Sequence, residues 1–127
     1  MRVRGSCNCG AVRFSVTDPL ARTTACHCGQ CRKQSGHYWA SAAAPEENYD
    51  IQGEPRWYES SPTAKRAFCS VCGCFLFWKA HAEREMSFSL GALDGDAKKM
   101  RLTENIFYDC KGEYYDVADD LPKRGSW

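Results

Sequence analysis

Eight of the nine cysteines fall into three short groups, and thiolates at this spacing are typical metal ligands. The groups are Cys7-Asn8-Cys9-Gly10, Cys26-His27-Cys28-Gly29-Gln30-Cys31 and Cys69-Ser70-Val71-Cys72-Gly73-Cys74, while Cys110 stands alone. A secreted disulfide framework would more often show an even cysteine count and a secretory signal, and neither is found. The cysteines therefore indicate metal binding in an intracellular protein and argue against disulfides.

The first and third groups predict one closed zinc site. Two thiolates on a tight Cys-x-x-Cys-Gly turn can point at one ion, while backbone N–H groups of the turn hydrogen-bond the sulfurs. Gly73 supplies the open backbone angles that such a turn needs, and Gly10 stands in the same place after Cys9. Tetrahedral zinc takes four ligands, which the two groups supply together as Cys7, Cys9, Cys69 and Cys72. The alternative is a set of buried free cysteines.

The second group predicts a different kind of site. Cys26, Cys28 and Cys31 are three ligands within one short loop, and three protein ligands with one open position are typical of catalytic zinc. The alternative is a second closed structural site, whose fourth ligand would come from Cys74, Cys110 or His27. The pattern favours packing for Cys74 and Cys110, and a His27 ring that points away from the metal. We expect two zinc ions per chain, the first acting as a structural staple.

Period-two alternation predicts the elements that position these residues. It indicates half-buried strands at 12–16, 86–92 and 106–110, with less regular strands at 37–44 and 75–80. Turn signals such as Asp18-Pro19 and Gly53-Glu54-Pro55 separate the strands. No segment keeps a helical period beyond about two turns, so we expect little helix, near 31–35. The length and composition predict one mainly β domain of short strands over residues 1–127.

Charge and hydropathy exclude several function classes. The 17 basic and 16 acidic residues leave no basic stripe, which argues against a nucleic-acid-binding zinc ribbon. No apolar run reaches the length needed to cross a bilayer, and we expect a cytoplasmic protein without a membrane partner. A metal-buffering or redox role is disfavoured because ordered cysteine turns indicate a fixed stoichiometry. The sequence leaves the oligomeric state open, a homo-oligomer included.

Two motifs, Cys26-His27-Cys28-x-x-Cys31-Arg32-Lys33-x-Ser35-Gly36 and Arg66-x-Phe68-Cys69-x-x-Cys72-Gly73, carry a family resemblance. In this order they closely resemble the family of glutathione-dependent formaldehyde-activating enzyme and centromere protein V. Three shorter segments look like further motifs of that family: Gly5-x-Cys7-x-Cys9-Gly10-x-Val12-x-Phe14, Gly91-x-Leu93-Asp94 and Asp119-Asp120-Leu121-Pro122. The resemblance implies a β-tent fold of short antiparallel strands with two zincs. It implies a structural ion on Cys7, Cys9, Cys69 and Cys72 and a functional ion on Cys26, Cys28 and Cys31.

The activity that the resemblance implies is addition of the glutathione thiol to formaldehyde, giving S-hydroxymethylglutathione. This reaction is formally the reverse of a carbon–sulfur lyase. Two positions depart from the family pattern: Asn105-Ile106 replaces a frequent His-Ile pair, and Tyr114-Tyr115 stands where a Trp is frequent. If these residues shape the substrate pocket, the substrate differs from that of the namesake.

The leading hypothesis is a zinc-dependent carbon–sulfur lyase-type enzyme acting on a glutathione-like thiol and a small aldehyde. An open zinc position would bind a thiol as thiolate, and we favour this over polarisation of the aldehyde because three thiolates reduce the acidity of the metal. Candidate anchors for an anionic thiol are Arg32, Lys33 and Arg66, with solvated surface charge as the alternative reading. No residue stands out as an acid–base partner.

The alternative function is a non-catalytic zinc-binding module that interacts with a protein. Such a module would show an exposed aromatic patch, and the sequence offers Trp39, Trp57, Tyr58 and Trp78 for it.

Overall fold

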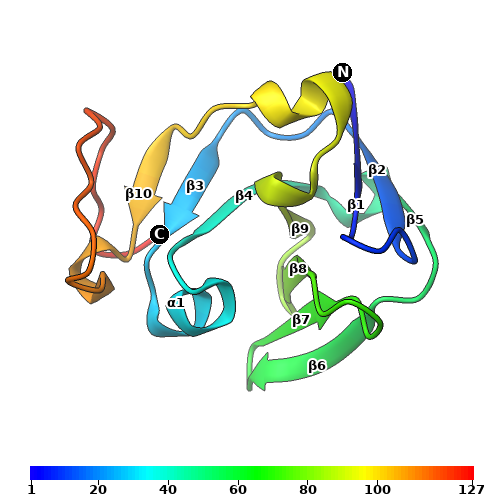
Figure 1. Ribbon diagram of the computed structural model, residues 1–127, viewed down its shortest axis with the longest axis horizontal. Helices are drawn as coiled ribbons and strands as arrows, with labels where there is room; N and C mark the ends of the chain where they lie inside the picture. The colour runs from blue at the N-terminus through cyan, green and yellow to red at the C-terminus, as the bar shows by residue number, and fades with distance from the viewer.

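Two β-sheets of unequal size make up most of the structure, a computed structural model that describes residues 1–127 (Figure 1). The small sheet is antiparallel and has the order β1-β2-β5, formed by β1 (Arg2–Ser6), β2 (Arg13–Thr17) and β5 (Tyr49–Gln52). The large sheet has the order β10-β3-β4-β9-β8-β7-β6. Its strands are β3 (Thr23–Cys26), β4 (Trp39–Pro45), β6 (Arg56–Ser61), β7 (Ala64–Phe68), β8 (Phe75–Ala80), β9 (Glu85–Ser89) and β10 (Glu104–Ile106). The prediction of a mainly β fold is confirmed.

Helical structure is confined to short segments. One α-helix, α1 (Gly29–Ser35), connects β3 to β4, as expected near 31–35. The remaining helices are 3-10 turns: η1 (Glu46–Asn48), η2 (Leu90–Ala92), η3 (Gly95–Lys99) and η4 (Tyr108–Cys110). None of these helices has the length and apolarity that spanning a bilayer requires.

Two of the expected strands end earlier than the alternation predicts. The strand expected at 86–92 stops at Ser89, where η2 begins, and the one expected at 106–110 stops at Ile106. Phe107 has a φ of +49°, in the left-handed region, and this conformation turns the chain out of the sheet. As a result Cys110 lies exposed on η4, so the expectation that it packs inside a strand is wrong.

The main core lies between the small sheet and one face of the large sheet. Phe14 of β2 packs edge-to-face on Phe77 of β8, with ring centroids 5.1 Å apart, and Phe77 pairs with Phe88 of β9. All three rings are buried. Because neighbouring residues of a strand point to opposite faces, the next pair in register, Trp78 and Ser87, faces away from this core. That second face of the large sheet carries the candidate functional site.

One strand pair departs from the antiparallel pattern. β10 lies parallel to β3, with Asn105 opposite Ala25 and Ile106 opposite Cys26, while all other neighbouring strands are antiparallel. On its other side β3 pairs with β4, so that Cys26 faces Trp39. The end of β3 is therefore held from both sides, which fixes the start of the loop that leads into α1.

Candidate metal centres and the adjoining cleft

A cluster of four cysteine sulfurs joins the two sheets. The Sγ atoms of Cys7, Cys9, Cys69 and Cys72 all lie within 4.8 Å of one another. Cys9 Sγ lies 3.6 Å from Cys7 Sγ and 3.7 Å from Cys69 Sγ, and none of these cysteines forms a disulfide. Zinc–sulfur bonds of about 2.3 Å in a tetrahedron place the sulfurs roughly 3.8 Å apart, so the dimensions of the cluster fit such an ion.

Backbone donors support this four-sulfur cluster, as the turn motif predicts. The Val12 N–H donates to Cys7 Sγ at 3.3 Å, and the Cys72 N–H donates to Cys69 Sγ at 3.5 Å. Gly10 and Gly73 have φ angles of +81° and +78°, which confirms the need for glycine after each turn. Cys74 packs half-buried against the main core and is not one of the four clustered cysteines.

The second cluster is built by the turn from β3 into α1. Cys26 ends β3, Cys28 is the N-cap of α1, and Cys31 lies in its first turn. The Cys31 N–H donates to Cys28 Sγ at 3.4 Å, so the thiol takes the place of the usual capping oxygen. The three sulfurs lie within 4.8 Å of one another, and no fourth His, Cys, Asp or Glu joins them.

The pKa values of these three thiols indicate that the cluster lacks a positive charge at its centre. Hydrogen bonds from Cys26 and Cys31 lower the pKa of Cys28 to about 2, and hydrogen bonding with Cys28 raises the pKa of Cys26 far above its ordinary range. Three sulfurs at this separation cannot all carry a negative charge without a cation among them. The donor set therefore suits a soft divalent cation, which would hold all three as thiolates.

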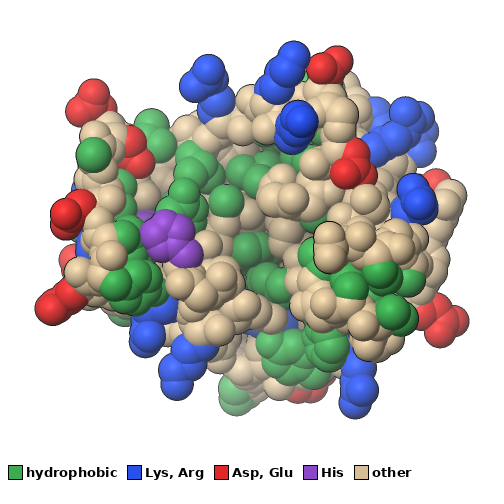
Figure 2. Space-filling view, viewed as in Figure 1, with side chains coloured by type: hydrophobic (Ala, Val, Ile, Leu, Met, Phe, Trp, Pro, Cys, Tyr) green, Lys and Arg blue, Asp and Glu red, His purple; other side chains and the backbone are tan.

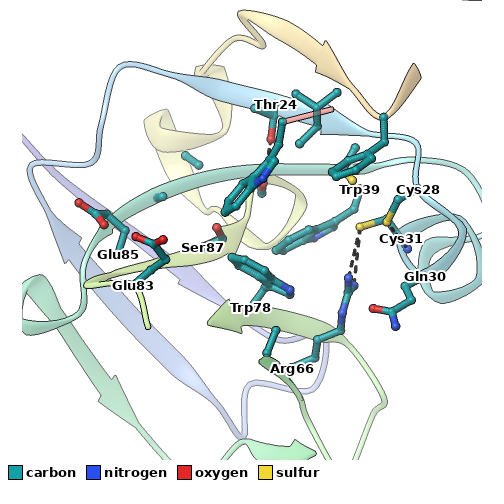
Figure 3. Close-up of a pocket in the computed structure, with 18 of the residues that line it drawn as sticks. Thr24, Cys28, Gln30, Cys31, Trp39, Arg66, Trp78, Glu83, Glu85 and Ser87 are labelled. Atoms are coloured by element: carbon teal, nitrogen blue, oxygen red, sulfur yellow. Dashed lines mark hydrogen bonds between the residues drawn. The ribbon is translucent and has the colours of Figure 1, made fainter. Parts of the chain in front are cut away.

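Arg66 contacts the second cluster from β7, a strand of the large sheet that is not a neighbour of β3. It projects from β7, is 4% exposed, and donates from its two terminal nitrogens to Cys31 Sγ at 3.6 and 3.7 Å (Figure 3). Its Nη1 also donates to Gln34 Oε1 at 2.7 Å, whereas its buried Nε has no partner. Arg66 thus lies at the site, while Arg32 and Lys33 lie on α1 outside the cleft lining, and their role as anchors stays a prediction.

A cleft of about 470 Å³ opens from the three-cysteine cluster across the second face of the large sheet. This volume lies within the usual range of small-molecule sites. Trp39 lines the cleft beside the cysteines, Glu83 and Glu85 lie at its other end, and Trp78 lies between the two ends (Figure 3). Neither carboxylate is predicted from the sequence, nor is Trp127, which also lines the cleft, because only tertiary structure brings them to it.

The His27 ring points away from the three sulfurs, as expected. Its Nε2–H donates to Asn105 Oδ1 at 2.9 Å, and its Nδ1 accepts from the Tyr115 hydroxyl. The ring is fully buried, and this burial lowers the pKa of His27, so the ring is neutral. Asn105 and Tyr115 belong to the two pairs that depart from the family pattern, and they line a separate cavity of about 210 Å³.

The charges on one face of the molecule and the placement of the aromatic residues give little support to the competing functions. On the face shown in Figure 2, acidic and basic side chains are spread around the rim, and neither sign gathers into a stripe. Among the four aromatic residues considered for a protein-binding patch, only Tyr58 is exposed, at 41%. Trp39 is buried, Trp57 stacks on Phe77 with centroids 6.1 Å apart, and Trp78 lines the cleft.

Comparison with known proteins gives a family match, one protein of similar sequence and one solved structure of similar fold. Residues 2–110 match the family described as glutathione-dependent formaldehyde-activating enzyme. An uncharacterized lyase of Schizosaccharomyces pombe is 24% identical over 116 residues, covering 91% of this chain and 85% of the yeast protein. The crystal structure of a Rhodobacter sphaeroides protein superposes with a TM-score of 0.64 at 24% identity, covering 78% of this chain and 96% of that one. This likeness shows a shared fold.

Proposed function

The chain belongs to the family of the glutathione-dependent formaldehyde-activating enzyme, and we propose that it is a zinc-dependent, carbon–sulfur lyase-type enzyme. In this proposal, residues 1–127 act as one zinc-binding domain that joins a glutathione-like thiol to a small aldehyde such as formaldehyde. The observation that carries the proposal is the three-cysteine cluster, which has no fourth side-chain ligand and lies in the wall of a cleft large enough for a thiol peptide.

Cys26, Cys28 and Cys31 would hold the functional zinc and leave one position free for the thiol. Zinc bound there would supply positive charge that favours the deprotonated form of a thiol. Arg66 adds a second positive charge, fixed by Gln34, beside the sulfur of Cys31. This charge offsets part of the negative charge that three clustered thiolates accumulate in a buried place.

The reaction itself needs only the addition of sulfur to a carbonyl carbon. A sulfur–carbon bond forms, the π electrons of the C=O bond move to oxygen, and that oxygen takes the proton released by the thiol. Trp39 and Trp78 would exclude water around the reacting atoms because their rings line the cleft. The Trp39 indole N–H donates to Ser89 Oγ at 2.8 Å, which holds its ring in place.

The four-cysteine cluster would hold the second zinc in a structural role. Its sulfurs follow β1 and β7, and Cys9 and Cys69, whose sulfurs are in contact, are 60 residues apart in sequence. An ion that closes so long a loop restricts the unfolded chain and stabilises the contact between the sheets. All nine cysteines are free, and we propose a reducing compartment, the cytoplasm, as the place of action.

The proposed activity is tested by exchange between formaldehyde, glutathione and their adduct, followed by NMR exchange spectroscopy at equilibrium. The zinc-loaded protein should accelerate this exchange, and Cys28→Ser should abolish the acceleration while Cys74→Ser keeps it. The variants are the correct reference, because the uncatalysed reaction is already appreciable. Equal exchange rates for wild type and Cys28→Ser would exclude formaldehyde chemistry, and a cobalt-substituted spectrum with two four-thiolate sites would overturn the open position.

A further inference from the structure

The end of the cleft far from the cysteines carries two carboxylates without a cationic partner. Glu83 is exposed and Glu85 is half-buried, both line the cleft, and neither side chain forms an ion pair or accepts a hydrogen bond (Figure 3). Arg84, between them in sequence, pairs instead with Glu47. Lys79, on the neighbouring strand, reaches the backbone oxygen of Glu83 and not its carboxylate.

The basic residues of the cleft are already engaged. Arg22 pairs with Glu104, whose side chain is 7% exposed and also pairs with Arg124, and Arg66 donates to Cys31 and Gln34. These two arginines are the only basic side chains in the cleft lining. Glu83 and Glu85, the acidic residues of the lining, are therefore carboxylates with which no basic side chain of the cleft is paired.

Aromatic rings accompany these carboxylates in the cleft. Trp78 and Trp127 both line it, and their rings meet edge to face with centroids 5.7 Å apart. The face of an indole ring attracts a cation, more strongly where water is partly excluded. Carboxylates and indole rings in one cleft form the kind of environment that holds an ammonium group.

A buried pair of hydroxyl groups lies in the wall of the same cleft. Thr24 and Ser41 are 8% and 6% exposed, and their oxygens are 3.3 Å apart. Neither hydroxyl has another protein partner, and their mutual bond uses only one of the two protons. The other O–H is a free donor at the cleft, suited to a carbonyl oxygen of a bound ligand.

We propose that the thiol substrate is a peptide-like thiol with an ammonium group at the end opposite its sulfur. The ammonium binds at Glu83 and Glu85 beside the Trp78 and Trp127 rings, and an amide carbonyl accepts from the Thr24–Ser41 pair. This inference rests on the proposed function, which places the sulfur at the three-cysteine cluster. Glutathione itself suits this end of the cleft less well, since its ammonium is accompanied by a carboxylate that the two glutamates repel.

The test compares two amides of glutathione that differ in one charge. In both probes the glycine carboxylate is converted to an amide, with 1,3-diaminopropane for the cationic probe and butylamine for its neutral counterpart. Calorimetry on the zinc-loaded protein should show that the cationic probe binds at least about fivefold more tightly than the neutral one. This preference should fall with added salt. The preference should disappear in the Glu83→Gln/Glu85→Gln variant and persist in Glu54→Gln, which changes an exposed carboxylate elsewhere.

The outcomes separate this inference from the function on which it rests. Equal binding of the two amides to wild type, or an unchanged preference in the double variant, would overturn the cationic substrate and leave the thiol–aldehyde proposal standing. If neither glutathione nor either amide binds, the cationic substrate and the thiol–aldehyde proposal are both overturned. The substituted carboxylates lie at the end of the cleft far from the cysteines, so the double variant should match wild type in zinc content and thermal unfolding. This match would exclude misfolding as the cause of a lost preference.

Discussion

Arg66 and Cys31 are 35 residues apart in sequence, yet two guanidinium nitrogens of Arg66 lie 3.6 and 3.7 Å from the Cys31 sulfur. Strand pairing creates this contact, because Arg66 lies opposite Trp78 in the sheet and shares its face. Gln34 accepts from the same guanidinium and so fixes its orientation. A residue that contacts a metal ligand in this way, without binding the metal itself, typically orients the ligand and changes the affinity of the site for metal.

Arg66→Met should weaken metal binding at the three-cysteine cluster while leaving the four-cysteine cluster loaded. Loss of the charge beside Cys31 should lower the affinity of that site by about 10- to 100-fold, as for other residues that contact a metal ligand. Competition with a chromophoric chelator measures this, with the tighter site as internal reference. Arg56→Met, an exposed change on the neighbouring strand, is the matched control, and an equal effect of both changes would contradict the assigned role.

Cys72→Ser should unfold the protein or make it insoluble. The four-cysteine ion closes a loop of about sixty residues, and a structural zinc site contributes its binding energy to folding directly. Thermal unfolding and zinc content measure the effect. Cys74→Ser, two positions away and outside the cluster, should keep both ions and most of the stability. A well-folded Cys72→Ser protein with two zincs would disprove the structural assignment.

Cys28→Ser should remain folded and lose about one zinc per chain. The ligands of the lost ion all come from one strand-to-helix turn, so the ion closes only a short loop. Its loss therefore costs less stability than loss of the four-cysteine ion, which closes a long loop. Near-ultraviolet circular dichroism and metal analysis of the same sample test both statements. Global unfolding comparable with that of Cys72→Ser would make both sites structural.

His27→Gln should reduce the dependence of stability on pH. Burial holds the pKa of His27 below its ordinary value near 6.5, so the folded ring is neutral when the unfolded one begins to bind a proton. The stability contributed by the neutral ring is fully present above pH 6.5 and is lost as the pH falls toward the folded pKa, with a slope of up to about 1.4 kcal/mol per pH unit. Urea unfolding between pH 7.5 and 5.5, with zinc in excess, should show a steeper loss for wild type. Parallel curves for the two proteins would refute the prediction.

The sequence was sufficient to locate the ligand groups and several of the elements that carry them. Each cysteine group is local, so its spacing and its following glycine are readable without the fold, and Gly73 has the predicted backbone angle. The apolar run at 75–80 coincides with β8, and the expected turn of helix lies within α1. These features depend on neighbours in the sequence, which is why a single sequence predicts them.

The contacts that complete the site could not be predicted in this way. All four residues of β3 are buried, and a strand whose two faces are both covered loses the alternation by which strands are recognised. Arg66 reaches Cys31 only through the register of β7 with β8. Cys110 was misplaced because the left-handed Phe107, which ends β10, has no signal in the residue pattern.

The hydrogen bond from Tyr115 to His27 joins residues 88 positions apart, and this separation sets an order of events during synthesis. Every thiol of both clusters lies within the first 72 residues, whereas the partners of the His27 ring, Asn105 and Tyr115, come much later. A chain leaving the ribosome therefore presents a complete set of sulfurs before its last strands exist. Metal captured at that stage would organise the chain up to residue 72 as a template, onto which β8, β9 and β10 add last.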